Sequence, residues 1–145
     1  MWEDLELAKK KLHEKGLTLV IVKDSRVLFE SKAHGVSAFL EALDKFWDKM
    51  RGTSVADKVI GKAIALLCIY AKVRAVYSST ISVKAKQIFE NHNVHFEWDT
   101  LVEKILDAHG GDICPFEKAV MEIDNPKEAY GKLKALLESF KNGIK

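Results

Sequence analysis

Apolar residues at the start of the chain recur at the spacing of an α-helix. Leu5, Ala8 and Leu12 lie three or four positions apart, so they share one face of a helix. Gly16 follows this pattern directly, and glycine is the usual residue just beyond a helix end. The sequence therefore predicts a first helix over Glu3–Lys15 that buries its leucines.

Two strand-like segments come next. Residues 17–23 (LTLVIVK) and 26–32 (RVLFESK) are rich in β-branched and aromatic side chains and are separated only by Asp24 and Ser25. Two such segments around a short polar turn predict an antiparallel hairpin. After them, residues 36–50 place their large apolar side chains on one helical face and most of their charges on the other, which predicts an amphipathic helix covering a sheet.

A continuous apolar stretch occupies the middle of the chain. Ser54 and Asp57 stand three residues apart at its head, a spacing at which side chains can cap the first turn of a helix. Because the residues after Lys62 are apolar on every side, we interpret residues 54–71 as one helix buried against a sheet. The other expected elements are strands at residues 73–79 and 94–98 and helices at residues 83–92, 115–122 and 126–140.

Strands that alternate with helices, after an opening antiparallel hairpin, are typical of a layered α/β domain. We predict a three-layer α/β fold, with a central mixed sheet of four or five strands and helices on both faces. The 145 residues, 48% of them hydrophobic, are enough for one well-buried core, and no repeat or linker divides them. We therefore expect a single domain over residues 1–145.

Composition narrows the range of partners. The net charge is only +2 and lysines are interspersed with acidic residues, so nucleic-acid binding is unsupported although not excluded. The acidic start of the chain lacks the pattern of a signal peptide, and the longest apolar run (AIALLCIYA) is too short to cross a bilayer. We expect no membrane association. The two cysteines suit a reducing compartment, so we expect a cytoplasmic protein.

Motifs for common cofactors are absent from the sequence. It has no glycine-rich nucleotide- or phosphate-binding motif, no Cys-x-x-Cys and no His-Glu-x-x-His. His92 and His95 are three residues apart, but His95 should share a solvated strand face with Glu97, and zinc needs further ligands. We expect no cofactor and no bound metal.

The charges at the head of the middle stretch are candidate ligand-binding residues. In a helix beginning at Ser54, Lys58 and Lys62 lie on one face, next to Gly61, which leaves room. Free backbone amides and the helix dipole at that end favour an anion, so we predict that Ser54, Lys58 and Lys62 bind a phosphate or carboxylate. Asp57 would orient this ligand or move a proton. In the alternative interpretation, Asp57 only caps the helix and the lysines extend into solvent.

The stretch GGDICPFEKAV contains a second group of candidates. Pro115 suits the first position of a helix, which makes Cys114 its N-cap and Glu117 its third residue. A thiol at a helix N-terminus has a lowered pKa and can be reactive. No base is visibly paired with Cys114, so a catalytic nucleophile and a ligand-contacting or packing cysteine both stay open.

The order of elements, together with SVADKVIGKAIALL and CPFEKAV, resembles a small prokaryotic family of deaminase-like proteins, a domain of unknown function in the cytidine deaminase-like superfamily. The resemblance covers nearly the whole chain and implies a pocket at the head of the central helix. In zinc deaminases that helix opens with His-x-Glu, and the following helix carries Pro-Cys-x-x-Cys. Here residues 56–58 (Ala-Asp-Lys) align with the first motif and residues 79–85 with the second, so the resemblance implies the fold without the zinc chemistry.

Two hypotheses of function follow. The first is a zinc-free enzyme or binding protein for an anionic, nucleotide-like small molecule, with Asp57, Cys114 and Glu117 as catalytic residues. The second is a non-catalytic domain that uses the same scaffold for protein or nucleic-acid contacts. A short distance from Cys114 and Glu117 to Lys62 would favour the first. The resemblance is also compatible with a homodimer, because deaminase-like relatives commonly self-associate.

Overall fold

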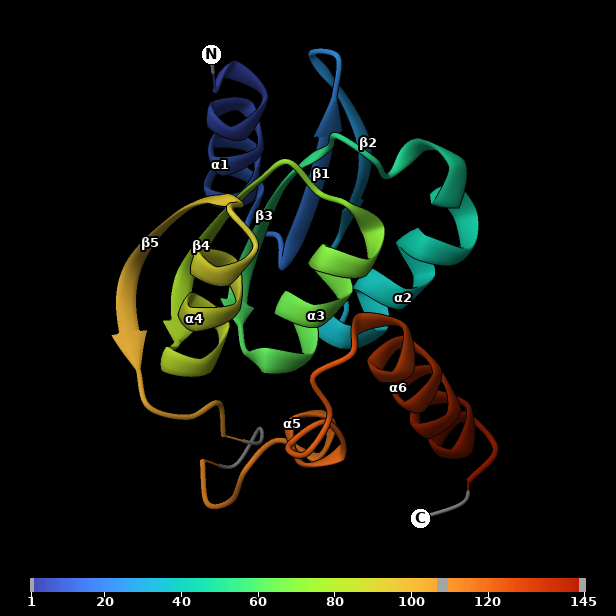
Figure 1. Cartoon of the computed structure of the whole chain (residues 1–145). Coiled ribbons are helices and arrows are strands. Elements are labelled where there is room, and N and C mark those ends of the chain that lie inside the picture. Colours follow the sequence, from blue (N-terminus) through green and yellow to red (C-terminus); the bar gives the residue numbers. More distant parts are fainter. Residues whose placement is uncertain (1, 107–109, 144–145) are drawn as a thin grey trace.

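The computed structural model describes residues 2–106 and 110–143. Its centre is a five-stranded sheet with the strand order β2-β1-β3-β4-β5 (Figure 1). The strands are β1 (Leu19–Lys23), β2 (Arg26–Ser31), β3 (Ser54–Ile60), β4 (Ala75–Ser82) and β5 (His95–Val102). The helices are α1 (Glu3–Lys15), α2 (Gly35–Phe46), the 3₁₀ helix η1 (Trp47–Lys49), α3 (Lys62–Ala71), α4 (Val83–Asn91), α5 (Pro115–Ala119) and α6 (Pro126–Lys141).

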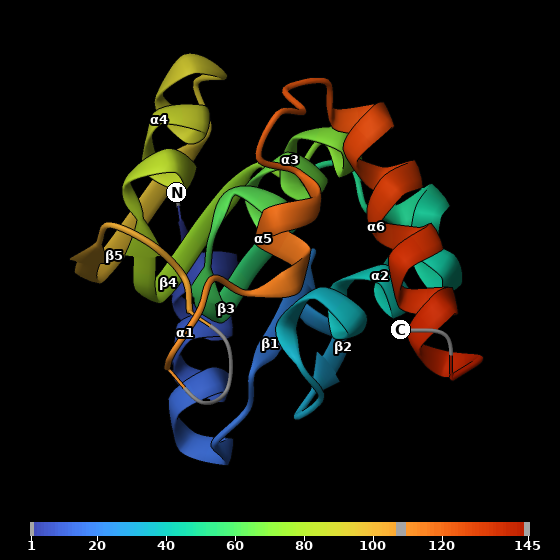
Figure 2. The ribbon, with the colours of Figure 1, turned by 90° about the horizontal axis from the view of Figure 1, so that it is seen from below.

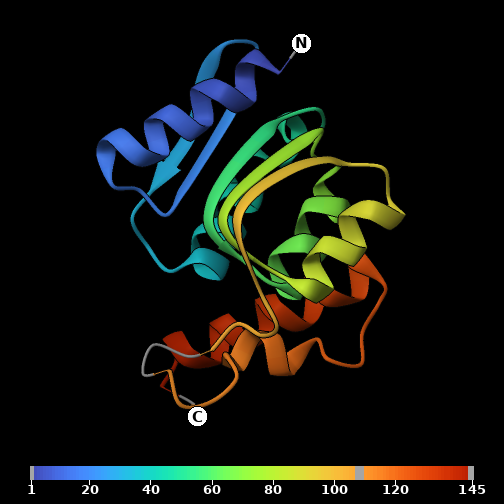
Figure 3. The same ribbon diagram turned by 90° about the vertical axis from the view of Figure 1, so that its left-hand side faces the viewer.

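Helices cover both faces of the sheet. Helix α1 lies on one face, whereas α2, α3 and α4 lie on the other, with α6 packed against the outside of α3 (Figure 3). The core has two corresponding parts. Leu5 and Leu12 of α1 pack on Val20 and Ala56 of the sheet, and a larger cluster fills the space between the sheet and the helices on its other face. The predicted three-layer α/β fold is confirmed.

The strand directions place three strand ends at one edge of the molecule. β1 pairs antiparallel with both β2 and β3, whereas β3, β4 and β5 are parallel. The carboxyl ends of these three strands therefore meet, and Figure 2 looks onto this edge, where α5 lies across the start of α3. In open α/β sheets, ligands usually bind beyond the carboxyl ends of parallel strands.

The opening antiparallel hairpin is confirmed, with strands slightly shorter than predicted. Asp24 and Ser25 both adopt left-handed φ angles, 51° and 67°, and the strands on either side of them are paired antiparallel. Two residues of positive φ give the turn the twist that neighbouring strands need. Helix α1 also has the predicted bounds, Glu3–Lys15, and ends in left-handed Gly16.

The middle stretch differs from its predicted form. Ser54–Ile60 is strand β3 rather than the first half of a helix, and α3 begins only at Lys62. The strand is central in the sheet and helices cover both of its faces, so it lacks the polar and apolar alternation that marks a half-exposed strand. The predicted helix cap at Ser54 is therefore wrong, and so is the alignment of residues 56–58 with a helix start.

The second half of that stretch is a buried helix, as predicted. Leu66 is 1% exposed, Leu67 is fully buried, and Ile69 packs against the core. The helix is flanked by the sheet on one side and by α6 on the other. Among the described residues, no helix combines the length and the apolar character that crossing a membrane would need.

Candidate functional site

A cavity of about 240 Å³ opens at the carboxyl end of β3; we call it the β3 cavity. Its polar wall residues come from the start of α2, the end of β3 and the segment around α5, together with Thr18 just before β1. Glycines at the two helix starts, Gly35 and Gly61, also line it. The side chains on its wall that could bind a ligand or take part in a reaction are those of His34, Asp57, Lys58, Cys114 and Glu117.

Asp57 is the most unusual of these residues because its carboxyl group is buried without full pairing. The residue is 1% exposed, Oδ1 accepts the N–H of Val59 at 3.3 Å, and Oδ2 has no hydrogen-bond partner among the residues that the structure describes. Burial raises the pKa of Asp57 to about 8, although the backbone amides of Val59 and Lys58 lower it in part. Asp57 is therefore mostly protonated at neutral pH.

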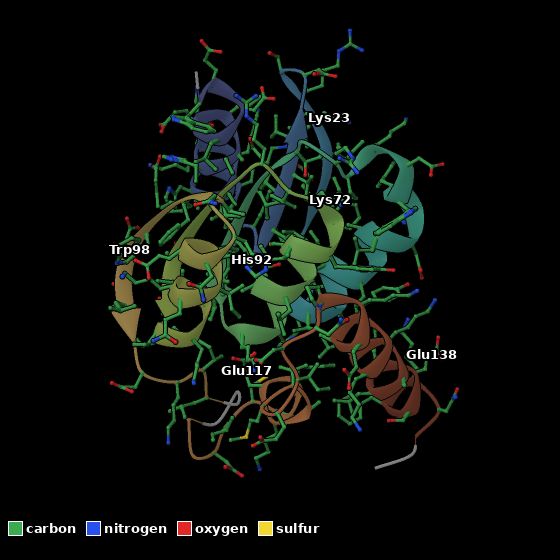
Figure 4. The ribbon with its side chains drawn as sticks, viewed as in Figure 1. Lys23, Lys72, His92, Trp98, Glu117 and Glu138 are labelled. Atoms are coloured by element: carbon green, nitrogen blue, oxygen red, sulfur yellow. The ribbon has the colours of Figure 1, made fainter. Side chains whose placement is uncertain are left out.

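Glu117 reaches from α5 to the start of α3, as Figure 4 shows. Its Oε1 accepts the N–H of Lys62 at 2.8 Å and its Oε2 accepts the N–H of Ala63 at 2.7 Å. Burial raises the pKa of Glu117, and the two amides and Lys62 oppose this shift. Glu117 is thus a side-chain cap for α3 supplied by a distant part of the chain.

Gly61 is required by this cap. A Cβ at that position would overlap the carboxylate of Glu117 and the side chain of Ile105. The sequence-based interpretation put Gly61 inside a helix, beside a ligand. In the structure it precedes α3, and a side chain of the protein itself takes the space.

The three predicted ligand-binding residues do not meet. Ser54 is buried at the amino end of β3, away from the β3 cavity, and Lys58 is exposed on its wall. Lys62 does not line this cavity: its Nζ lies 3.0 Å from the carbonyl oxygen of Met121 and 3.1 Å from Asp124. The predicted pairing of the two lysines on one helical face is wrong, because they lie on different elements.

The three predicted catalytic residues do share one cavity. Asp57, Cys114 and Glu117 all line the β3 cavity. Cys114 is 5% exposed and is the N-cap residue of α5, with Pro115 at the first helical position, as predicted. Glu117 accepts a hydrogen bond from the backbone N–H of Lys62. The short distance between Glu117 and Lys62 that would favour a ligand site is therefore present. A catalytic role for the three stays a prediction.

Sequence reasoning missed the start of α2 as part of the site. His34 precedes the helix and packs against Phe116 with ring centroids 5.9 Å apart, and Gly35 is the first helical residue. The available signal was a His-Gly pair directly before an amphipathic helix. The hydrophobic pattern predicts the helix only from Val36, one residue later, and so leaves both residues outside it.

A polar cluster also lies on the opposite face of the sheet, under α1. The Tyr77 hydroxyl donates a hydrogen bond to Asp99 and lies 3.2 Å from Nε2 of His13. Burial raises the pKa of Tyr77, and the hydrogen bond to Asp99 raises it further, so the hydroxyl keeps its proton. This cluster fastens α1 to the sheet.

His95 and Glu97 share one face of β5, as predicted, with Nε2 2.9 Å from Oε2, and α1 lies over this face. They are half-buried rather than solvated, because Trp2 stacks on His95 and Lys9 pairs with Glu97 at 3.1 Å. Within the described ranges, no group of three or more His, Cys, Asp or Glu side chains is arranged to hold a metal ion. The absence of a bound metal stays a prediction.

The fold and the cavity define the class of this protein: an α/β domain built on one mixed sheet, with a polar cavity at the carboxyl end of its parallel strands. Residues 7–137 match the family described as TM1506, a domain of unknown function (DUF1893). The match spans most of the chain, and the chain belongs to this family.

Two solved structures are similar to the chain. The crystal structure of a DUF1893 family protein (TM1506) from Thermotoga maritima has a TM-score of 0.83 and 30% sequence identity, and the match covers 96% of this chain and 91% of that one. A diaminohydroxyphosphoribosylaminopyrimidine deaminase/5-amino-6-(5-phosphoribosylamino)uracil reductase from Thermotoga maritima is only weakly similar. Its TM-score is 0.42 and its identity 19%, over 81% of this chain and 39% of that one. None of the curated proteins compared with the chain matches it.

Proposed function

We propose that this protein binds a small polar molecule in the β3 cavity and that Asp57 contacts it. The observation that supports this most strongly is the carboxyl group itself: Asp57 is 1% exposed, lines the cavity and leaves Oδ2 unpaired among the described residues. Burying an unpaired polar group costs free energy, so a protein gains little from such a residue unless something binds it. A bound molecule would supply the missing partner.

The size of the β3 cavity limits the ligand. A protein cavity of about 150 Å³ can hold one benzene molecule. The 240 Å³ measured here therefore suits a single ring with polar substituents, or a compact acyclic molecule. For a nucleotide-like ligand, we propose that the base would occupy the cavity and that exposed Lys58 would meet an anionic group at the rim.

If a reaction takes place in this cavity, we propose that Asp57 transfers a proton in it. A group whose pKa is near 8 can exchange a proton efficiently at neutral pH, and Asp57 has that property. Both carboxylate oxygens of Glu117 accept hydrogen bonds from the start of α3. Its role would therefore be to hold α5 and α3 together as part of the cavity wall. Cys114 would contact the ligand from the start of α5.

The second hypothesis, a non-catalytic domain for protein or nucleic-acid contacts, stays a prediction, as do a homodimer and a cytoplasmic location. We prefer small-molecule binding because a contact surface would use exposed residues. It would leave the buried carboxyl group of Asp57 without a purpose.

Native mass spectrometry and NMR can test the proposed function. Native spectra of the purified protein should show a small adduct that disappears on denaturation. A ¹⁵N-labelled sample titrated with a fragment set of neutral, cationic and anionic compounds should show shifts at Asp57 and Val59 rather than at the α1 face. Asp99→Asn, on that face, is the matched control and should leave the titrations unchanged. If no fragment of any charge perturbs the cavity residues, the proposal fails.

A further inference from the structure

The start of α2 borders the β3 cavity, and its first backbone amides have no hydrogen-bond partner among the described residues. His34 is the N-cap residue and gives no side-chain hydrogen bond, and the helical pattern begins with the N–H of Ala38 bonded to the carbonyl of His34. The N–H groups of Gly35 and Val36 therefore have no partner in the part of the chain that the structure describes. Both residues line the cavity. Helix α2 has 12 residues, so its dipole adds positive potential at this point.

Asp57 lies beside these amides. A Cβ built on Gly35 would stand 3.7 Å from Oδ1 of Asp57, so the helix start and the carboxyl group are in contact distance. Oδ1 already accepts the N–H of Val59, whereas buried Oδ2 is unpaired among the described residues. The cavity wall thus combines two free N–H donors with a carboxyl oxygen that needs a partner.

Helix α3 shows how this protein satisfies such a helix start. Its first two amides, of Lys62 and Ala63, each donate to one oxygen of the Glu117 carboxylate. The start of α2 borders the same cavity, and although the carboxyl group of Asp57 lies beside it, no carboxylate among the described residues accepts a hydrogen bond from its first amides. The two helix starts therefore differ: a side chain of the protein accepts from the first amides of α3, whereas no described side chain accepts from the first amides of α2.

We infer that the ligand of the β3 cavity carries a carboxylate, and that this carboxylate lies between the N–H groups of Gly35 and Val36 and the carboxyl oxygen of Asp57 that is unpaired among the described residues. The inference rests on the proposed function and specifies its ligand class. One ligand oxygen accepts hydrogen bonds from the two amides, and the other accepts a hydrogen bond from the O–H of Asp57. Such hydrogen bonds to an ionised acceptor are short and strong.

The charges around Asp57 favour this class over a cation. Because the pKa of Asp57 is about 8, the residue is neutral at pH 7 and offers an O–H to an anion. An amidinium or amine would instead need the ionised form of Asp57 as its partner. It would also carry its own positive charge next to the positive end of α2, which is unfavourable. Among the described residues, the other titratable groups that face Asp57 or line the cavity are His34 from the start of α2, Lys58 from β3, Cys68 from α3, and Cys114 and Glu117 from the start of α5.

The test uses three molecules of one shape and three charges: acetate, acetamide and acetamidinium. Each is titrated to 50 mM into ¹⁵N-labelled protein at pH 7 and constant ionic strength. Acetate should shift the amides of Gly35 and Val36 and saturate, with at least about tenfold tighter binding than acetamide. If acetamidinium or acetamide binds more tightly than acetate at these residues, the carboxylate inference is wrong while small-molecule binding stands. If none of the three shifts these amides, the carboxylate inference is also wrong, and the adduct and fragment experiments decide the proposed function separately.

The dependence on pH provides a second readout. Between pH 7 and 9.5, loss of the Asp57 proton at a pKa of about 8 should weaken acetate binding about 30-fold. Asp57→Asn keeps a donor that does not titrate, so its acetate affinity should change less than about twofold over this range. Cys114→Ser should keep the full decrease, which separates the thiol from the carboxyl group. Weakening of the same size in Asp57→Asn would overturn the role of Asp57.

Discussion

Replacing the buried acid at position 57 by its amide should stabilise the protein, increasingly so as the pH rises. The pKa of Asp57 is raised from 3.8 to about 8 in the native state, so between these pH values the native protein holds a proton that the unfolded chain releases. Rising pH therefore favours the unfolded state until about pH 8, above which the difference stays constant. Asp57→Asn removes this dependence, because the amide does not titrate.

The magnitude follows from the size of the shift. About three pH units separate 3.8 from pH 7, and each is worth about 1.4 kcal/mol, so the acid lowers the native stability by about 4 kcal/mol at pH 7. The asparagine amide replaces a carboxyl oxygen that is unpaired among the described residues, and a buried unpaired donor costs about 1–3 kcal/mol. We expect a net gain of about 1–3 kcal/mol at pH 7. The gain should be near zero at pH 5 and larger at pH 9.

Urea unfolding of both proteins at pH 5, 7 and 9 measures this difference directly. The control is Asp48→Asn, an exposed aspartate on η1, whose stability should follow the wild type at all three pH values. If the free-energy difference between Asp57→Asn and wild type is the same from pH 5 to pH 9, Asp57 does not titrate differently in the native state. The account of the carboxyl group would then be refuted.

Three further predictions concern the contacts around the cavity and under α1. Glu117→Ala should lower the free energy of unfolding by about 1–2 kcal/mol, because two amides at the start of α3 lose their acceptor. Gly61→Ala should destabilise wild type more than it destabilises Glu117→Ala, since its Cβ would overlap that carboxylate; equal losses in urea unfolding would disprove the contact. Tyr77→Phe should cost about 1–2 kcal/mol, and a double-mutant cycle with Asp99→Ala, which removes the acceptor, should return a coupling of at least about 0.5 kcal/mol. Independent effects of those two substitutions would exclude the hydrogen bond.

Local patterns were sufficient for the elements at the margins of the fold. The leucine spacing of α1, the Asp24-Ser25 turn and the proline starts of α5 and α6 all act through neighbouring residues, and the structure contains each of them. The prediction of one helix over residues 54–71 was wrong for a physical reason. A strand with helices on both faces is apolar on both, and nothing in its own residues distinguishes it from the buried helix that follows.

The site was only partly predictable for a related reason. Asp57, Cys114 and Glu117 are predicted as catalytic residues because carboxyl and thiol groups can transfer protons or act as nucleophiles, and the fold brings all three to one cavity. Their partners could not be foreseen, because the capping of α3 by Glu117 joins residues 55 positions apart. The start of α2 was overlooked because its contribution comes from backbone amides, which every sequence has.

The long-range cap also joins the stability of the C-terminal segment to the occupancy of the cavity. Glu117 and Cys114 form part of the cavity wall only while α5 is docked on α3, so undocking of this short helix would open the cavity and expose the first amides of α3. A ligand that requires the closed wall must therefore slow hydrogen exchange at Lys62 and Ala63, which it does not touch. Slower hydrogen exchange at these two amides would therefore reveal ligand binding at a place that the ligand itself does not contact.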